Sequence, residues 1–141
     1  MFSKACEYAI KAMVFIQYKS QQDERVNLNE IAEAIDSPAA FTAKILQQLR
    51  KSDLLESIMG VKGGFRILEN KQISLKEIIV AIDGNGIFSN CVLGLKACSS
   101  TNPCPVHNKY AKIRGEMERI MQETFLADLA NQLNLKKISL K

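Results

Sequence analysis

Three of the four cysteines lie close together in the sequence, and the only histidine follows them. Six residues separate Cys91 from Cys98, five separate Cys98 from Cys104, and His107 stands three positions after Cys104. Thiolates and imidazoles are the side chains that bind zinc and iron–sulfur clusters. In a chain without a secretory signal, this grouping indicates metal binding or redox chemistry rather than a set of disulfides. The segment around residue 100 is therefore the first candidate site.

The spacing alone leaves three alternatives of comparable weight. Structural zinc sites usually contain a close Cys-x2-4-Cys pair, which this segment lacks. Iron–sulfur clusters are larger and accept wider spacing from a loop that surrounds them. In the metal-free alternative, Cys98 and Cys104 are ordinary surface thiols and His107 is a polar residue of a first helical turn. The remaining cysteine, Cys6, is expected to be a small buried thiol, with Glu7 beside it as a solvated acid.

The residues before this segment predict a helix-turn-helix. Apolar residues at helical spacing predict a first helix over residues 3–19. An Asn-x-x-Glu capping box opens a second helix within residues 27–36. A third helix follows over residues 37–51, with Ser37 as its N-cap and Pro38 at its first helical position. Two helices joined by so tight a turn match the motif whose second helix enters a DNA major groove.

Two short strands and a glycine-rich turn follow the third helix. Residues 54–59 and 65–68 predict strands, and the glycines at 60, 63 and 64 permit the positive φ values of a hairpin turn. The order helix-helix-helix-hairpin is that of a winged helix. Residues 1–83 are therefore predicted to form a winged-helix DNA-binding domain, closed by a helix that a second capping box opens at Ser74.

The rest of the chain predicts a loop and a long helix. Residues 84–104 form a cysteine-containing loop, longer than the unstructured loops usual in compact domains. Residues 105–141 are predicted to form a dimerisation helix and a C-terminal tail. The helix carries an apolar stripe spaced alternately by four and three, which predicts pairing with a partner helix through Tyr110, Ile113, Met117 and Ile120. The fold class is mainly α-helical with a small β-hairpin.

Charge is concentrated on the proposed DNA-reading surface. The net charge of the whole chain is only +4, but residues 38–66 contain five basic residues against two acidic ones. Small alanines would let the third helix enter a groove, and polar side chains would contact bases and phosphates. The predicted DNA-binding residues are Ser37, Ala39, Ala40, Thr42, Lys44, Gln47, Gln48, Arg50, Lys51, Lys62, Gly63 and Arg66.

Several classes of protein have little support in the sequence. No run of about 18 apolar residues predicts a membrane span, and the charged N-terminal segment lacks the apolar stretch of a signal peptide. A cytoplasmic location is therefore expected. The chain has no phosphate-binding glycine loop and no histidine pair, and a single histidine offers no plausible Ser-His-Asp set. We do not expect an enzyme.

The sequence resembles the Rrf2 family of bacterial transcription regulators, which includes regulators of the IscR and NsrR types. The similarity lies in the Ser-Lys-Ala-Cys-Glu-Tyr-Ala start, the Leu-Arg-Lys end of the third helix, the Gly-Val-Lys-Gly-Gly-Phe wing, the Ile-Ile-Val-Ala-Ile-Asp helix and the cysteine loop. It covers nearly the whole chain in the same order. It implies a homodimeric winged-helix regulator that binds a double-stranded DNA operator.

The resemblance also implies roles for the candidate ligands. Cys91, Cys98 and Cys104 match the three cysteines that hold an iron–sulfur cluster in many members. His107 matches the fourth ligand of the [2Fe-2S] regulator, and Glu7 matches an acidic residue that the nitric-oxide sensor uses from the partner subunit. Cys91 and Cys98 stand one residue further apart than in cluster-binding relatives. A [2Fe-2S] cluster is favoured, with [4Fe-4S] and a metal-free form as alternatives.

A competing hypothesis comes from another class of protein. The same apolar stripe and cysteines suit a zinc-stabilised or metal-free protein-interaction module. Colour discriminates between them, because a cluster absorbs visible light and zinc does not.

Overall fold

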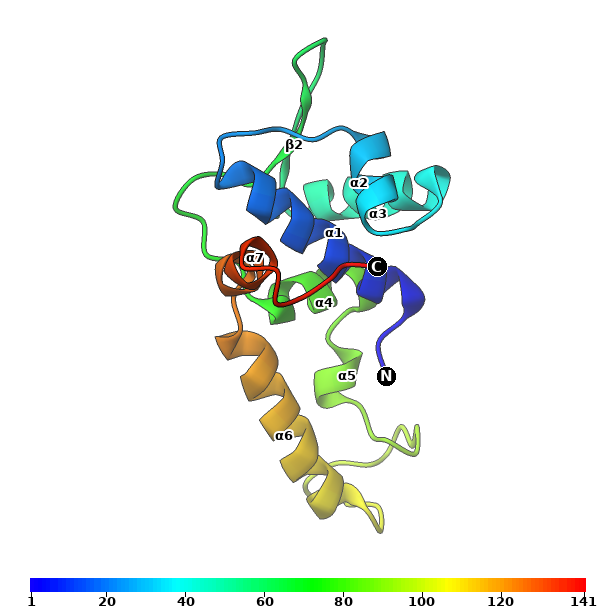
Figure 1. Ribbon diagram of the computed structural model, residues 1–141. Helices are drawn as coiled ribbons and strands as arrows, with labels where there is room; N and C mark the ends of the chain where they lie inside the picture. The colour runs from blue at the N-terminus through cyan, green and yellow to red at the C-terminus, as the bar shows by residue number, and fades with distance from the viewer.

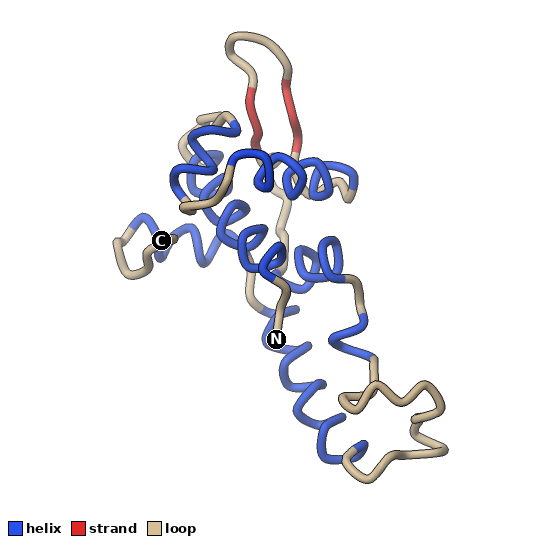
Figure 2. The backbone as a smooth tube through the Cα atoms, turned by 90° about the vertical axis from the view of Figure 1, so that its right-hand side faces the viewer, coloured by secondary structure: helices blue, strands red, loops and turns tan.

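The molecule is elongated, with a hairpin at one end and a loop at the other. The computed structural model describes residues 1–141 (Figure 1). Its elements in chain order are α1 (Lys4–Ser20), α2 (Leu28–Ala34), α3 (Ala39–Lys51), β1 (Glu56–Ile58), β2 (Gly64–Arg66), α4 (Leu75–Asp83), α5 (Gly86–Ser89), α6 (His107–Glu123) and α7 (Leu126–Asn134). The hairpin projects beyond α2 and α3, whereas the segment between α5 and α6 lies at the opposite end (Figure 2). The predicted class, mainly α with a small hairpin, is confirmed.

Local capping signals set the starts of three helices. The Ser3 side chain accepts a hydrogen bond from the Cys6 backbone amide at 3.0 Å, which begins α1. Capping boxes built on Asn27 and on Ser74 begin α2 and α4, as the sequence predicts. Each box satisfies backbone amides that have no partner in the first helical turn. These helices therefore begin where nearby polar side chains replace the missing carbonyls.

The start of α3 differs from the prediction. Pro38, not Ser37, is the N-cap, and no side chain caps this helix. The Ser37 hydroxyl instead accepts a hydrogen bond from the Thr42 hydroxyl at 2.9 Å. The prediction that Ser37 caps the helix is wrong, because this side-chain contact replaces the bond to a backbone amide.

The wing is a short antiparallel hairpin with a fixed base. Its register pairs Glu56 with Arg66 and Ile58 with Gly64. Phe65 also forms a bridge to Val26, whose carbonyl accepts from the Phe65 amide at 2.8 Å. The strands are shorter than predicted because Leu54 and Leu55 are buried in the core instead of extending β1.

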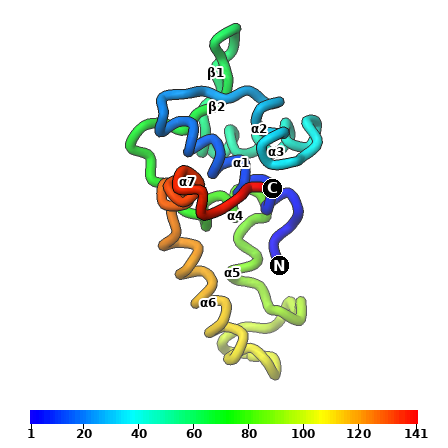
Figure 3. The backbone as a smooth tube through the Cα atoms, viewed as in Figure 1, coloured from blue at the N-terminus to red at the C-terminus, as the bar shows by residue number.

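The main core joins the winged-helix elements to the end of the chain. Met13, Ile31, Leu46 and Ile78 bring α1, α2, α3 and α4 together and are fully buried. The sequence predicts only a dimerisation helix and a C-terminal tail over residues 105–141. The structure instead shows the separate helix α7, which packs against α1 (Figure 3) and buries Leu126 completely.

A smaller core connects the loop to α1 and α4. Phe88 of α5 is buried against Cys6 and Ile79, and Met117 and Met121 of α6 pack on the same group. No residue of α6 is itself buried. The long helix is thus held to the domain along one side only. None of the helices combines the length and apolar character needed to cross a membrane.

Candidate metal centre and nucleic-acid interface

The loop between α5 and α6 brings the three predicted cysteines together. The Sγ atoms of Cys91, Cys98 and Cys104 all lie within 4.8 Å of one another, and those of Cys91 and Cys104 are 3.7 Å apart. All three are free thiols and are partly buried. The fold of the loop thus brings together three sulfur atoms whose residues are separated by six and five positions in the sequence.

Hydrogen bonds within the segment shape this loop. A turn after Cys91 is closed by the Gly94 amide, which donates to the Cys91 carbonyl at 2.9 Å, and Gly94 has a φ of +70°. The Asn102 side chain donates to the Ala97 carbonyl at 3.2 Å and folds the segment that follows Cys98. The Cys104 amide then lies 3.4 Å from the Cys98 sulfur. The loop has local order without a strand or a long helix.

The mutually close group consists of the three cysteines alone, but His107 contacts one of them. The Nδ1 atom of His107 lies 3.2 Å from Cys98 Sγ, at the first residue of α6. Glu7 pairs with Lys4 on α1 at 3.3 Å and lies outside the group of mutually close ligand atoms. Within one chain, the structure therefore supplies three sulfurs and one imidazole.

The environment of Cys91 favours its thiolate. Backbone amides of Leu95 and Leu93 donate to this sulfur, and the neighbouring thiols contribute further hydrogen bonds, which lower the pKa of Cys91 to about 7. The thiolate is the form that binds metals. In contrast, burial and the nearby Asp83 carboxylate raise the pKa of Cys6 to about 12, and this residue stays a neutral core thiol.

The donor set fits a thiolate-bound metal centre. Metal–sulfur bonds of about 2.3 Å in tetrahedral geometry place two thiolates roughly 3.8 Å apart. The separation of 3.7 Å between Cys91 and Cys104 matches this spacing. Cys98 and His107 form a second close pair. The sulfur spacing agrees with zinc as well as with iron.

Two residues that hold this loop were missed in the sequence. Arg114 of α6 donates from Nη1 to the Asn90 carbonyl at 2.8 Å, directly before Cys91. Phe88 anchors the start of the loop in the small core. Neither residue could be recognised from its neighbours in the sequence, because each acts through a contact with a segment that is distant along the chain.

The exposed side of α3 contains part of the predicted DNA-binding set. Ala40, Lys44, Gln47 and Lys51 are exposed at a helical spacing that places them on one face. Ala39 and Arg50 are also exposed. The face combines small residues with positive and amide groups.

Two residues of the predicted set point elsewhere. Thr42 is fully buried, and its hydroxyl donates to the Ser37 hydroxyl and the Pro38 carbonyl, both at 2.9 Å. Gln48 donates from its side-chain amide to the Ala81 carbonyl at 3.0 Å, so it connects α3 to α4. In this conformation Thr42 is unavailable to a base, which corrects the expectation that it contacts DNA. Helical spacing alone could not reveal either contact.

The basic residues of the wing have different environments. Lys62 is exposed near the tip, whereas Arg66 pairs with Glu56 across the hairpin at 2.6 Å. At Gly63, an added Cβ would lie 2.1 Å from the Ile58 carbonyl oxygen, so only glycine fits the turn. Arg25, missed in the sequence, donates to the Lys62 carbonyl at 3.4 Å and adds a third basic residue beside the wing.

Comparison with known proteins identifies the family. The model of the Rrf2 family, described as an iron-dependent transcriptional regulator, matches residues 2–132. The chain belongs to the Rrf2 family. It is a DNA-binding transcriptional regulator, and the members it matches are regulators and not enzymes.

Relatives and solved structures agree with this assignment. This Rrf2 protein is 29% identical over 134 residues to an HTH-type protein of Aquifex aeolicus, covering 93% of this chain and 92% of the relative. It is 25% identical over 133 residues to the HTH-type transcriptional regulator IscR of Yersinia pestis, covering 94% and 80% of the two chains.

Two solved structures show the same fold. The CymR structure, a global cysteine regulator of B. subtilis, has a TM-score of 0.77 at 23% identity and covers 93% of this chain and 96% of its own. IscR of T. potens has a TM-score of 0.76 at 21% identity, with 99% and 92% covered. The winged-helix architecture of the Rrf2 protein is confirmed.

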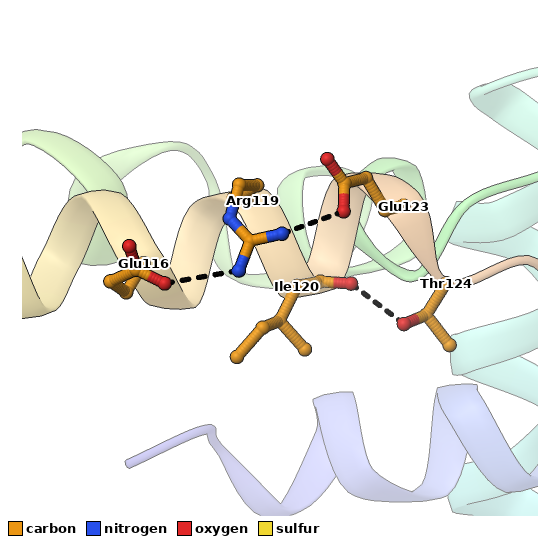
Figure 4. A network of polar contacts seen from close by, with 5 residues as sticks. All are labelled: Glu116, Arg119, Ile120, Glu123 and Thr124. Carbon is orange, nitrogen blue, oxygen red and sulfur yellow. Dashed lines mark hydrogen bonds and ion pairs between the residues drawn. The ribbon is translucent and has the colours of Figure 1, made fainter.

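The long helix of this Rrf2 protein presents an apolar face to solvent. Ile113 is 63% exposed and Ile120 is 51% exposed. On another side of α6, Arg119 pairs with Glu116 at 3.1 Å and Glu123 at 2.9 Å, away from the Ile120 side chain (Figure 4). Of the four predicted dimer residues, Met117 packs on the small core of its own chain, and Tyr110 is only half-buried.

Proposed function

We propose that this chain is a homodimeric repressor or activator that binds a palindromic operator and senses its signal through an iron–sulfur cluster. The observation that carries this proposal is the convergence of three cysteine sulfurs in one loop of an Rrf2-family regulator, with His107 of α6 beside Cys98. The family description as iron-dependent supports iron over zinc.

The three sulfurs lie within 4.8 Å of one another, and the Cys91–Cys104 and Cys98–His107 contacts among these ligands would suit a [2Fe-2S] cluster. Cys91 with Cys104 would hold one iron, and Cys98 with His107 would hold the other. Each iron of such a cluster takes two protein ligands, whereas a cubane places one protein ligand on each iron. Bound at this site, the cluster would supply a redox-sensitive group that oxidants or nitric oxide can modify.

The exposed face of α3 would enter the major groove. Gln47 is the best placed side chain for base contacts, and Lys44, Arg50 and Lys51 would contact phosphates. The slim Ala39 and Ala40 would let the helix approach the bases. Lys62 would add a backbone contact from the wing, with Arg66 beside it but already paired to Glu56.

Pairing of two α6 helices would hold the two α3 helices of a dimer at a fixed distance from each other. The face of α6 that carries Ile113 and Ile120 is exposed in a single chain. A second copy would cover Ile113 and Ile120, and symmetry would place α3 of each copy on one half of the operator.

The small core connects the cysteine loop physically to the DNA-binding domain. Phe88 lies three residues before Cys91 and is buried against Cys6 of α1 and Ile79 of α4. A cluster that fixes the loop would therefore also bias the position of α1. A difference of about 1.4 kcal/mol between the two forms changes operator affinity tenfold.

Selection of bound sequences from random DNA tests this function. Anaerobically purified protein should be coloured, contain iron and sulfide, and enrich an inverted repeat whose half-sites are spaced by about one helical turn or a multiple. Cys98→Ser should lose the colour and bind the selected DNA at least several-fold differently. If no sequence is enriched, the proposed operator binding is wrong. If the purified protein is colourless and contains zinc, the site is a zinc site and not an iron–sulfur cluster.

A further inference from the structure

Two apolar side chains at the tip of the wing are exposed to solvent. Met59 is 91% exposed, and Val61 is more exposed than any other large apolar residue of the chain. Gly60 lies between them, with a φ of +104°. Isolated exposed apolar residues are common on protein surfaces. Here, however, both lie in the turn between β1 and β2, at the end of a hairpin that projects from the molecule (Figures 1 and 2).

The base of the hairpin holds this tip in place. Phe65 pairs with Val26 through two backbone hydrogen bonds, of 3.2 and 2.8 Å, and Arg66 pairs with Glu56. The turn is closed by the Gly63 amide, which donates to the Gly60 carbonyl at 2.9 Å. The two apolar side chains are therefore carried by an ordered turn on a paired base.

The charged residues of the hairpin beyond Glu56 are positive. Between residues 57 and 68 the charged residues are Lys62 and Arg66, and no carboxylate is present. The Arg25 guanidinium also reaches the Lys62 carbonyl. Glu56, the nearest acid along the hairpin, is already paired with Arg66. The acids Asp23, Glu24, Glu30 and Glu69 line the hollow beside the wing together with Arg25 and Lys62. A narrow, apolar and positively charged projection is complementary to the negative and narrow minor groove of DNA.

We propose that Met59 and Val61 form an apolar wedge that enters the operator minor groove and partly unstacks one base step. This proposal rests on the operator binding proposed above. Apolar side chains inserted between base steps bend DNA toward the major groove. Flexible pyrimidine–purine steps unstack most easily, so the wedge would select for such a step where the wing meets the DNA.

The size of the patch favours DNA over a protein partner. A stable protein interface covers about 800 Å² on each partner. Two side chains at a hairpin tip fall far below this area. A wedge between base pairs needs only one or two side chains, and Lys62 beside it provides the phosphate contact.

The test compares three variants on a selected operator. The double variant Met59→Ser with Val61→Ser removes the wedge without changing charge. The control Met59→Leu with Val61→Ile keeps it apolar, and Lys62→Ala removes only a positive charge. Bending is measured by energy transfer between dyes at the ends of the operator, and affinity is measured at several salt concentrations.

The serine variant should bend the operator less and bind it about tenfold more weakly, with an unchanged salt dependence. The apolar control should behave like the unmodified protein. Lys62→Ala should reduce the salt slope by about one, because one phosphate contact is lost. Unchanged bending and affinity in a serine variant with native melting behaviour would overturn the wedge and leave operator binding intact.

A second measurement uses the unmodified protein. 2-Aminopurine placed at the step that faces the wing should brighten on binding, because its fluorescence rises when it is unstacked. No brightening at any step within reach of the wing would contradict the wedge. Failure of the unmodified protein to select any DNA sequence would instead overturn operator binding, and the wedge with it.

Discussion

The Nδ1 atom of His107 lies 3.2 Å from the sulfur of Cys98. This contact makes His107 the proposed fourth ligand within one chain, while Glu7 pairs with Lys4 on α1. The contrast between these two residues leads to a first prediction about the metal centre.

His107→Ala should lose most of the bound iron or shift the visible spectrum, because one iron would lose a protein ligand. Glu7→Ala should keep both the iron content and the spectrum. The measurement is iron content and absorption after anaerobic reconstitution. His107→Cys is a matched variant that should retain iron with a changed spectrum, since a thiolate replaces the imidazole. An unchanged His107→Ala beside a colourless Glu7→Ala would reverse the assignment.

A second prediction concerns the dimer. Ile113→Lys with Ile120→Lys should convert the protein to a monomer, because two charges would be buried without partners between paired helices. Asn108→Lys, an exposed position on another side of α6, should remain a dimer. Analytical ultracentrifugation gives the mass of each variant. A monomeric unmodified protein would contradict this prediction directly.

A third prediction concerns the last helix. Leu126→Ala should lower the free energy of unfolding by about 3 kcal/mol, because the side chain is fully buried in the main core. Leu135→Ala should change it by less than about 0.5 kcal/mol, because Leu135 is 60% exposed. Urea unfolding followed by circular dichroism measures both. Equal effects would mean that α7 does not dock on the DNA-binding domain.

A fourth prediction separates the buried thiol from the loop thiols. Burial and the Asp83 carboxylate raise the pKa of Cys6 from about 9 to about 12, so its protonated form dominates at pH 8. In metal-free folded protein, iodoacetamide should therefore label the three loop cysteines and leave Cys6 unlabelled. Mass spectrometry should show a fourth label only after unfolding, and Cys6→Ala should show three labels in both states. Rapid labelling of Cys6 in folded protein would argue against its burial.

The raised pKa of Cys6 also sets a pH dependence. Above the unfolded value of about 9, the unfolded thiol releases its proton while the folded thiol keeps it. The folded state then binds more protons, and stability falls as the pH rises from about 9 toward 12. Cys6→Ala should show a weaker loss of stability over this range in alkaline urea unfolding.

Elements that depend on neighbouring residues can be predicted from the sequence alone. Capping boxes at Asn27 and Ser74, the glycines of the wing turn and the apolar spacing of α1 and α3 act within a few residues, so they can be read along the chain. The family resemblance and the set of candidate ligands also followed from the sequence.

The contacts that these elements and side chains make depend on the tertiary structure. It buried Thr42 and tied Gln48 to α4, and it placed α7 in the core instead of in a tail. It also placed His107 beside Cys98 and packed Met117 against the small core of its own chain. Each outcome depends on contacts between segments far apart in sequence, and helical spacing gives the direction of a side chain around its own helix without saying which surface lies opposite.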